Sequence, residues 1–128
     1  MNLLLDTHAF LWWVDGVSLP PVALDAVRDP SNTVWLSAAS VWEITIKASL
    51  GKLKLPDRAV RFVEHHRKLN RFSWLPVEPE ALDILQDLPL HHRDPFDRLL
   101  IAQAISLQHT LISADNVFAN YSVPRIWS

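Results

Sequence analysis

The stretch "DPFDRLLIAQAISLQHTLISAD", residues 94–115, decides the fold because it joins a capped helix to a buried strand. Asp94 and Pro95 are residue types that favour the N-cap and the first position of a helix. Apolar residues then recur at helical spacing as far as Leu107. Residues 109–115 are richer in β-favouring types and predict a strand that ends at Asp115. A helix that leads into such a strand is the building unit of α/β proteins.

The same alternation extends over the rest of the chain. Strands are predicted at residues 2–6, 33–37, 72–77, 109–115 and 123–128. Helices are predicted at residues 7–16, 20–30, 37–53, 56–70, 78–89 and 94–108, with a short helix or turn at 116–121. Strands separated by helices predict a three-layer α/β/α sandwich with a mainly parallel central sheet of about four or five strands. The length of 128 residues fits one domain, residues 1–128.

Composition excludes several kinds of site. Because the chain has no cysteine, it has no disulfides, thiolate zinc sites or cysteine nucleophiles. Because it has only two glycines, it has no glycine-rich phosphate loop. No apolar stretch approaches the roughly 18 residues that span a membrane, and the N-terminus lacks the pattern of a signal peptide. We therefore expect a cytoplasmic protein without a membrane segment.

The net charge of −2 is unevenly distributed along the chain. Residues 1–43 carry a net charge of −4, residues 44–77 carry +6 and residues 78–128 carry −4. One interpretation of the basic middle is a solvated helical face with its Lys and Arg side chains outward. The other is a surface that meets phosphates or an acidic partner.

Four acids from distant parts of the sequence are predicted at one edge of the sheet. Asp6 closes the first strand, and Asp115 closes the strand at 109–115. Helices that follow strands begin at the same carboxyl edge, so Glu43 falls in the early part of one helix and Asp97 in the first turn of another. In open α/β sheets, ligands bind outside this edge.

Each acid also has an ordinary local interpretation. Asp6 and Asp115 fit the caps of the turns that follow them. Glu43 fits an i,i+4 pair with Lys47. Asp94 fits a helix N-cap, which explains it adequately. Taken one at a time, such roles are more common than metal binding.

Taken together, the local roles leave charge near the core unexplained. Glu43 lies in "VWEITI", with apolar neighbours on both sides. Asp97 shares its helical face with Leu100, Ile101 and Ala104. A buried carboxylate costs several kcal/mol unless something compensates it, and neighbouring carboxylates repel each other. A divalent cation among the acids would resolve both problems.

The ligand types indicate which ion and which chemistry to expect. Carboxylate oxygens suit Mg²⁺ or Mn²⁺. The adjacent histidine pairs at 65–66 and 91–92 would diverge on a helix, and no H-E-x-x-H spacing exists, so zinc is not favoured. A carboxylate-held ion activates water and stabilises charge on a phosphoryl oxygen. With a basic segment available to hold a polyanion, these features point to a nuclease.

Four segments carry a family resemblance: "LLLDTHAFLWW" (3–13), "LSAASVWEITIKASLGKL" (36–53), "HHRDPFDRLLIAQA" (91–104) and "LISADNVFANY" (111–121). In this order they resemble the PIN-domain ribonucleases, in particular the VapC-type toxins of bacterial toxin–antitoxin pairs. They cover most of the chain.

The resemblance implies a metal-dependent endoribonuclease that hydrolyses RNA with a metal-activated water and uses Mg²⁺ or Mn²⁺. It assigns the catalytic and metal-binding roles to Asp6, Glu43, Asp97 and Asp115. Ser113 stands where the family often has a small hydroxyl residue, which would orient a ligand or a water. Asp94 as a helix cap, and Thr7 and His8 directly after Asp6, are expected behind these ligands or beside the substrate. It also implies a homodimer and a cognate antitoxin that suppresses the activity.

Two other functions stay open at this point. An α/β phosphatase or phosphotransferase could use Asp6 as its nucleophile, although such enzymes commonly carry a second acid where His8 stands. A non-catalytic partner-binding module would use the acids only as helix caps. Replacing Asp6 or Asp97 by alanine separates a metal site from a helix cap. Loss of a metal ligand should abolish RNA cleavage and keep the fold, whereas loss of a cap should cost about 0.5–2 kcal/mol of stability and affect no catalysis.

Overall fold

The central sheet contains five parallel strands in the order β3-β2-β1-β4-β5. The strands are β1 (Asn2–Leu5), β2 (Thr33–Ser37), β3 (Ser73–Leu75), β4 (Thr110–Ile112) and β5 (Arg125–Ile126). Leu4 of β1 is paired with Trp35 of β2 on one side and with Leu111 of β4 on the other. The structure is a computed structural model and describes residues 1–128.

Six α-helices and one 3-10 helix connect the strands. They are α1 (Thr7–Val14), α2 (Pro21–Arg28), α3 (Ala38–Ser49), α4 (Ala59–Leu69), α5 (Pro79–Asp87), α6 (Pro95–Leu107) and η1 (Asn116–Asn120). None of these helices combines the length and the apolar composition that crossing a bilayer requires.

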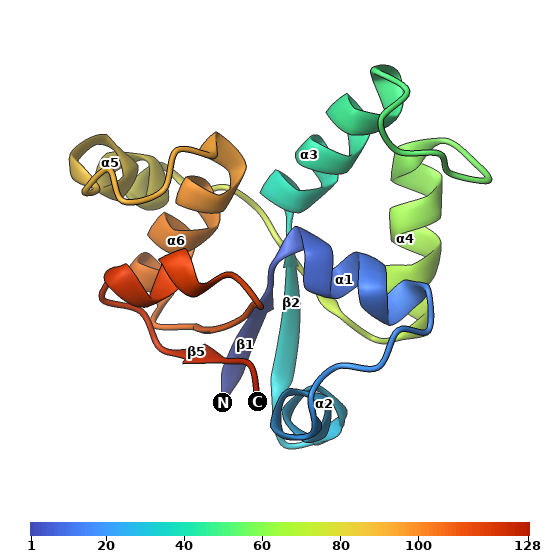
Figure 1. The fold of residues 1–128 in the computed structure, drawn as a ribbon, viewed down its shortest axis with the longest axis horizontal. Helices are drawn as coiled ribbons and strands as arrows, with labels where there is room; N and C mark the ends of the chain where they lie inside the picture. Colours follow the sequence, from blue (N-terminus) through green and yellow to red (C-terminus); the bar gives the residue numbers. More distant parts are fainter.

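Alternate side chains of β1 enter two hydrophobic cores, one on each face of the sheet. Leu3 and Leu5 are fully buried in a core that α1, α2, α3 and α4 complete. Leu4 is fully buried in the opposite core, which contains residues of α6 and η1 and packs against α5. Figure 1 shows the resulting layers, with α5 and α6 on one side of the strands and α1, α3 and α4 on the other. Apolar residues on both faces are what a covered parallel sheet requires.

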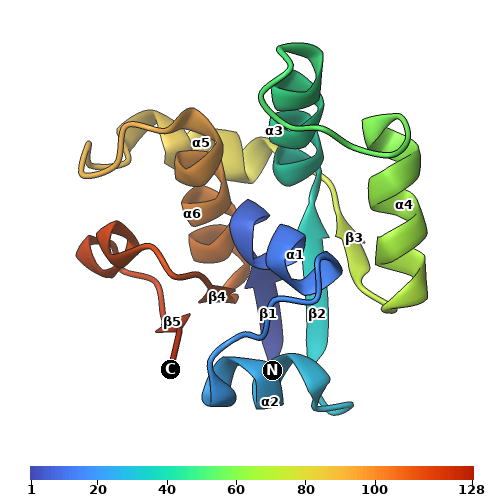
Figure 2. The ribbon, with the colours of Figure 1, turned by 45° about the vertical axis from the view of Figure 1, so that its right-hand side comes forward.

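The carboxyl edge of the sheet gathers the starts of several helices. In Figure 2 the strands β1 and β2 point upward to this edge, where α1 and α3 begin. The hydroxyl of Thr7 donates to the Ser40 hydroxyl at 3.0 Å, which ties the first turns of these two helices together. Asp94 caps α6 by accepting from two backbone amides of its first turn.

The predicted fold class is confirmed, with five strands and every pairing parallel. The predicted strand end at Asp115 is wrong, because β4 ends at Ile112. The three residues that follow form a turn, in which the Asp115 amide donates to the Ser113 hydroxyl at 3.1 Å. Asp115 therefore lies beyond the strand end and caps η1 instead.

Candidate metal centre

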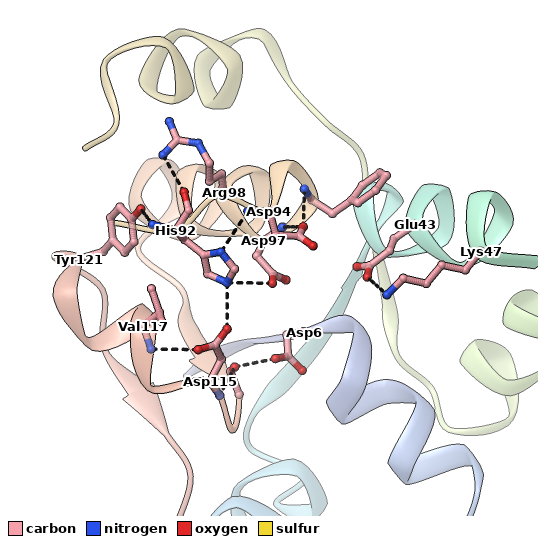
Figure 3. Close-up of polar contacts among 12 residues, drawn as sticks. Asp6, Glu43, Lys47, His92, Asp94, Asp97, Arg98, Asp115, Val117 and Tyr121 are labelled. Carbon is pink, nitrogen blue, oxygen red and sulfur yellow. Dashed lines mark hydrogen bonds and ion pairs between the residues drawn. The ribbon is translucent and has the colours of Figure 1, made fainter. Parts of the chain in front are cut away.

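Asp97, Asp115 and His92 bring three potential ligand atoms together at the carboxyl edge. His92 Nε2 lies 2.8 Å from Asp115 Oδ2 and 3.1 Å from Asp97 Oδ2. One ligand atom from each residue lies within 4.8 Å of the other two. These side chains come from the first turn of α6, from the turn after β4 and from the loop before α6 (Figure 3). The tertiary fold therefore joins them, not their spacing in the sequence.

Asp6 is fixed beside this group by hydrogen bonds to both carboxylate oxygens. Its side chain is buried directly after β1. Oδ1 accepts from the Ala9 amide at 2.7 Å, and Oδ2 accepts from the Ser113 hydroxyl at 2.5 Å. The same Ser113 oxygen accepts from the Asp115 amide. Ser113 thus connects the acid that follows β1 to the acid that follows β4.

Glu43 has one carboxylate oxygen without a protein partner. The residue is 2% exposed, and its Oε2 pairs with Lys47 Nζ at 2.6 Å. Oε1 is buried and accepts no hydrogen bond. Figure 3 shows the Glu43 carboxylate projecting from α3 on the side where Asp97 lies. A buried polar atom without a partner costs about 1–3 kcal/mol, so this oxygen is a feature that the helix alone does not explain.

The local roles foreseen for the acids exist, and they occupy only part of each carboxylate. Asp94 Oδ1 accepts both amides of the α6 first turn. Asp115 Oδ1 accepts from the Val117 amide at 2.9 Å, which leaves Oδ2 to face His92. Asp97 contacts His92 through Oδ2, which leaves Oδ1 for another partner. Capping a helix and facing a shared site are therefore compatible roles for one acid.

Burial and neighbouring acids make it unfavourable to ionise the carboxyl groups at this edge of the sheet. Burial, followed by the nearby charges of Asp94 and Glu43, raises the pKa of Asp97 to about 7. Asp6 adds to that rise, whereas His92 opposes it. Burial also raises the pKa of Asp6, although the Ser113 hydrogen bond lowers it. The edge thus holds more negative charge than the protein alone compensates.

Thr7 and His8 lie differently from the quartet. The Thr7 hydroxyl is buried and donates to Ser40, so it joins two helices and does not touch the carboxylates. His8 is exposed on α1. It lines an open pocket of about 300 Å³ with Asp6, Trp12, Ala114 and Asp115.

His92 is a residue that the sequence analysis discounted. Adjacent histidines diverge when they lie on a helix. Residues 90–94 instead form a turn and loop before α6, so His91 and His92 are not held in helical geometry. A usable signal was the position of His92 two residues before the predicted cap Asp94, because the start of α6 lies at the carboxyl edge.

Comparisons with known proteins identify relatives at the level of the family. The model of the PIN domain family matches residues 3–124. No curated protein matches the sequence.

Several solved structures share the fold. VapBC2 from Rickettsia felis, bound to a promoter DNA fragment, matches with a TM-score of 0.73 at 15% identity over 100% of both chains. VapBC-5 from Mycobacterium tuberculosis, a member of the VapBC family of toxin–antitoxin systems, matches with a TM-score of 0.64 at 20% identity over 99% of this chain and 98% of that one. FitAcB from Neisseria gonorrhoeae matches with a TM-score of 0.62 at 21% identity over 97% of this chain and 96% of that one.

Proposed function

The chain belongs to the PIN-domain family, whose members are generally nucleases, and on that basis we propose that it is a metal-dependent endoribonuclease. The proposed reaction is hydrolysis of RNA phosphodiester bonds in the presence of Mg²⁺ or Mn²⁺. The proposed holders of the ion are Asp6, Glu43, Asp97 and Asp115. In the cell the protein would act in the cytoplasm as the toxin of a type II toxin–antitoxin pair.

The observation that carries the proposal is that the acids at the carboxyl edge lack enough partners within the protein. Glu43 Oε1 is buried without a partner, and neighbouring acids help to raise the pKa of Asp97 to about 7. Both features are unfavourable in the protein alone, and a divalent cation would relieve both. The donor set consists mainly of carboxylate oxygens, which are the ligands that Mg²⁺ and Mn²⁺ prefer. The residues present therefore fit such an ion.

Each acid has a supporting contact that would keep it in place during the reaction. Ser113 holds Asp6, the η1 amide holds Asp115, and Lys47 neutralises one oxygen of Glu43. A bound divalent ion would supply an activated water molecule and would offset the charge that develops on the phosphoryl oxygens. The protein contributes fixed carboxylates that need little reorganisation to receive that ion.

The basic segment supplies a path for the RNA backbone. The connection between α3 and α4 lies at the upper end of the molecule, on the side to which the strands point (Figures 1 and 2). Lys52, Lys54 and Arg58 are exposed on this connection. Lys and Arg side chains hold phosphates independently of sequence. We infer that this connection binds the strand whose phosphate lies at the acidic edge.

An exposed apolar stripe on α3 supports the proposal of a protein partner. Trp42, Ile46 and Leu50 recur every four residues and are 56%, 40% and 62% exposed. An apolar patch of this kind commonly marks a protein–protein contact. VapBC-5, which shares this fold, is a member of the VapBC family of toxin–antitoxin systems. We infer that an antitoxin covers the stripe and that the protein forms a homodimer.

The contacts of Asp6 make the phosphotransferase alternative less favourable. A nucleophilic aspartate needs an accessible oxygen, but Asp6 is only 4% exposed. Both of its oxygens accept hydrogen bonds from the protein. Water is therefore the nucleophile that we propose.

The test is cleavage of labelled RNA by the purified protein. We expect cleavage with Mg²⁺ or Mn²⁺, none with EDTA, and none of a single-stranded DNA of the same sequence. Asp6→Asn and Asp97→Asn should abolish cleavage while the fold is retained. Asp87→Asn, which changes an exposed acid at the end of α5, is the matched control and should cleave normally. Cleavage that persists in EDTA, or in either site variant, would reject the proposal.

A further inference from the structure

His92 is held in a single orientation by contacts on several sides. Its backbone amide donates to the Tyr121 hydroxyl at 2.7 Å. Its Nδ1 accepts from the Asp94 backbone amide at 3.1 Å. Its ring packs against Phe118, with ring centroids 5.6 Å apart. Arg98 donates to backbone carbonyls of the same loop, so the segment that carries the ring is anchored as well.

The contact at Nδ1 determines which nitrogen carries the proton. A backbone amide always donates, so Nδ1 of His92 must offer its lone pair to Asp94. The ring proton therefore sits on Nε2. Nε2 donates to Asp115 Oδ2 at 2.8 Å, and Asp97 Oδ2 lies 3.1 Å from the same nitrogen (Figure 3). The ring nitrogen therefore lies between two carboxylates that come from different elements and is hydrogen-bonded to one of them.

The same contact argues against His92 as a metal ligand. Coordination through Nε2 requires its lone pair, which would move the proton to Nδ1. That proton would then oppose the Asp94 amide, and the hydrogen bond at 3.1 Å would be lost. The carboxylates of Asp97 and Asp115 keep acceptor capacity for a cation while Nε2–H donates to Asp115, because each carboxylate oxygen accepts more than one bond.

We propose that His92 is a positioning residue that holds Asp97 and Asp115 at the spacing needed to bind the divalent ion, and that it does not bind the ion itself. This inference rests on the proposed function, because the spacing matters only if the carboxylates hold a cation. It gives the centre an all-oxygen ligand set although a histidine lies in its midst. It also explains why two acids from distant segments approach one imidazole nitrogen.

The test compares Mn²⁺ affinity among His92 variants by calorimetry at one pH. We expect His92→Ala to weaken Mn²⁺ binding about 10–100-fold, the usual effect of removing a hydrogen-bond donor that orients metal ligands. We expect His92→Gln to recover most of that loss, because its amide donates from a similar distance. His91→Gln, the change at the exposed neighbour, should bind Mn²⁺ like the wild type.

A second readout on the wild-type protein separates positioning from coordination. Imidazole ¹⁵N spectra recorded before and after addition of Mg²⁺ should show that Nε2 of His92 keeps its proton. Loss of that proton would make His92 a ligand and overturn the inference. Unchanged or tighter Mn²⁺ binding by His92→Ala would also overturn it, and in both cases the proposed function would stand. A wild-type protein that binds neither ion would reject the proposed function and this inference together.

Discussion

Replacing Asp97 by Asn should stabilise the metal-free protein at alkaline pH. The pKa of Asp97 is raised from 3.8 to about 7, mainly by burial and then by Asp94 and Glu43. An acid whose pKa is raised by folding destabilises the folded state most above that pKa, and the penalty disappears below its ordinary pKa. A rise of this size sets an upper limit of about 4 kcal/mol on the penalty at pH 8. We expect Asp97→Asn to recover about 1–3 kcal/mol of this penalty, because neighbouring charged groups rearrange around the Asp97 carboxylate and relieve part of it.

The assay is urea unfolding in EDTA at pH 8 and at pH 4.5, followed by tryptophan fluorescence. The free energy gained by Asp97→Asn should be largest at pH 8 and should fall to about a quarter of that value at pH 4.5, which still lies above the ordinary pKa of 3.8. Asp87→Asn is the control for a general change of charge, because Asp87 is exposed. A variant that is less stable than the wild type at pH 8, or equally stabilised at both pH values, would refute the reasoning.

Three further changes test the supporting contacts. Ser113→Ala removes a buried donor to Asp6, so it should cost about 1–2 kcal/mol and move the onset of Mn²⁺ binding, measured by titration, to higher pH. Lys47→Met leaves the buried Glu43 carboxylate unpaired and should lower the free energy of unfolding, measured in EDTA, by about 1–2 kcal/mol. The double variant Lys47→Met, Glu43→Gln should regain that stability, because it removes the unpaired charge. Neutralising Lys52, Lys54 and Arg58 together should weaken the binding of all RNA sequences alike. It should also reduce the slope of log K against log salt concentration by about 2.

The sequence predicts the fold well because local signals and burial agree. The strands β1 and β2 are short, mainly apolar runs, and each leads directly into a helix whose N-cap is Asp6 or Ser37. The direction of the chain then places the acids at one edge without knowledge of any contact. The error at Asp115 is of a different kind, because the ordered turn after β4 depends on the Ser113 hydroxyl and not on strand propensity.

The contacts inside the site are less predictable because they depend on how loops pack. His92 approaches Asp97 and Asp115 only because Tyr121 and Arg98 anchor the loop before α6. Tyr121 lies 29 residues from His92 in the sequence, and no periodic pattern links the two. In Asp115 the predicted local role and the contact with the site use different oxygens, since Oδ1 accepts from the Val117 amide and Oδ2 faces His92.

Anomalous diffraction from crystals of the protein loaded with Mn²⁺ tests the central proposal most directly. The predicted result is an anomalous peak at the carboxyl edge, within about 2.5 Å of carboxylate oxygens from the proposed ligands Asp6, Glu43, Asp97 and Asp115. The contradicting result is a well-ordered crystal in which Mn²⁺ occupies other positions and these carboxylates still bond only to the protein.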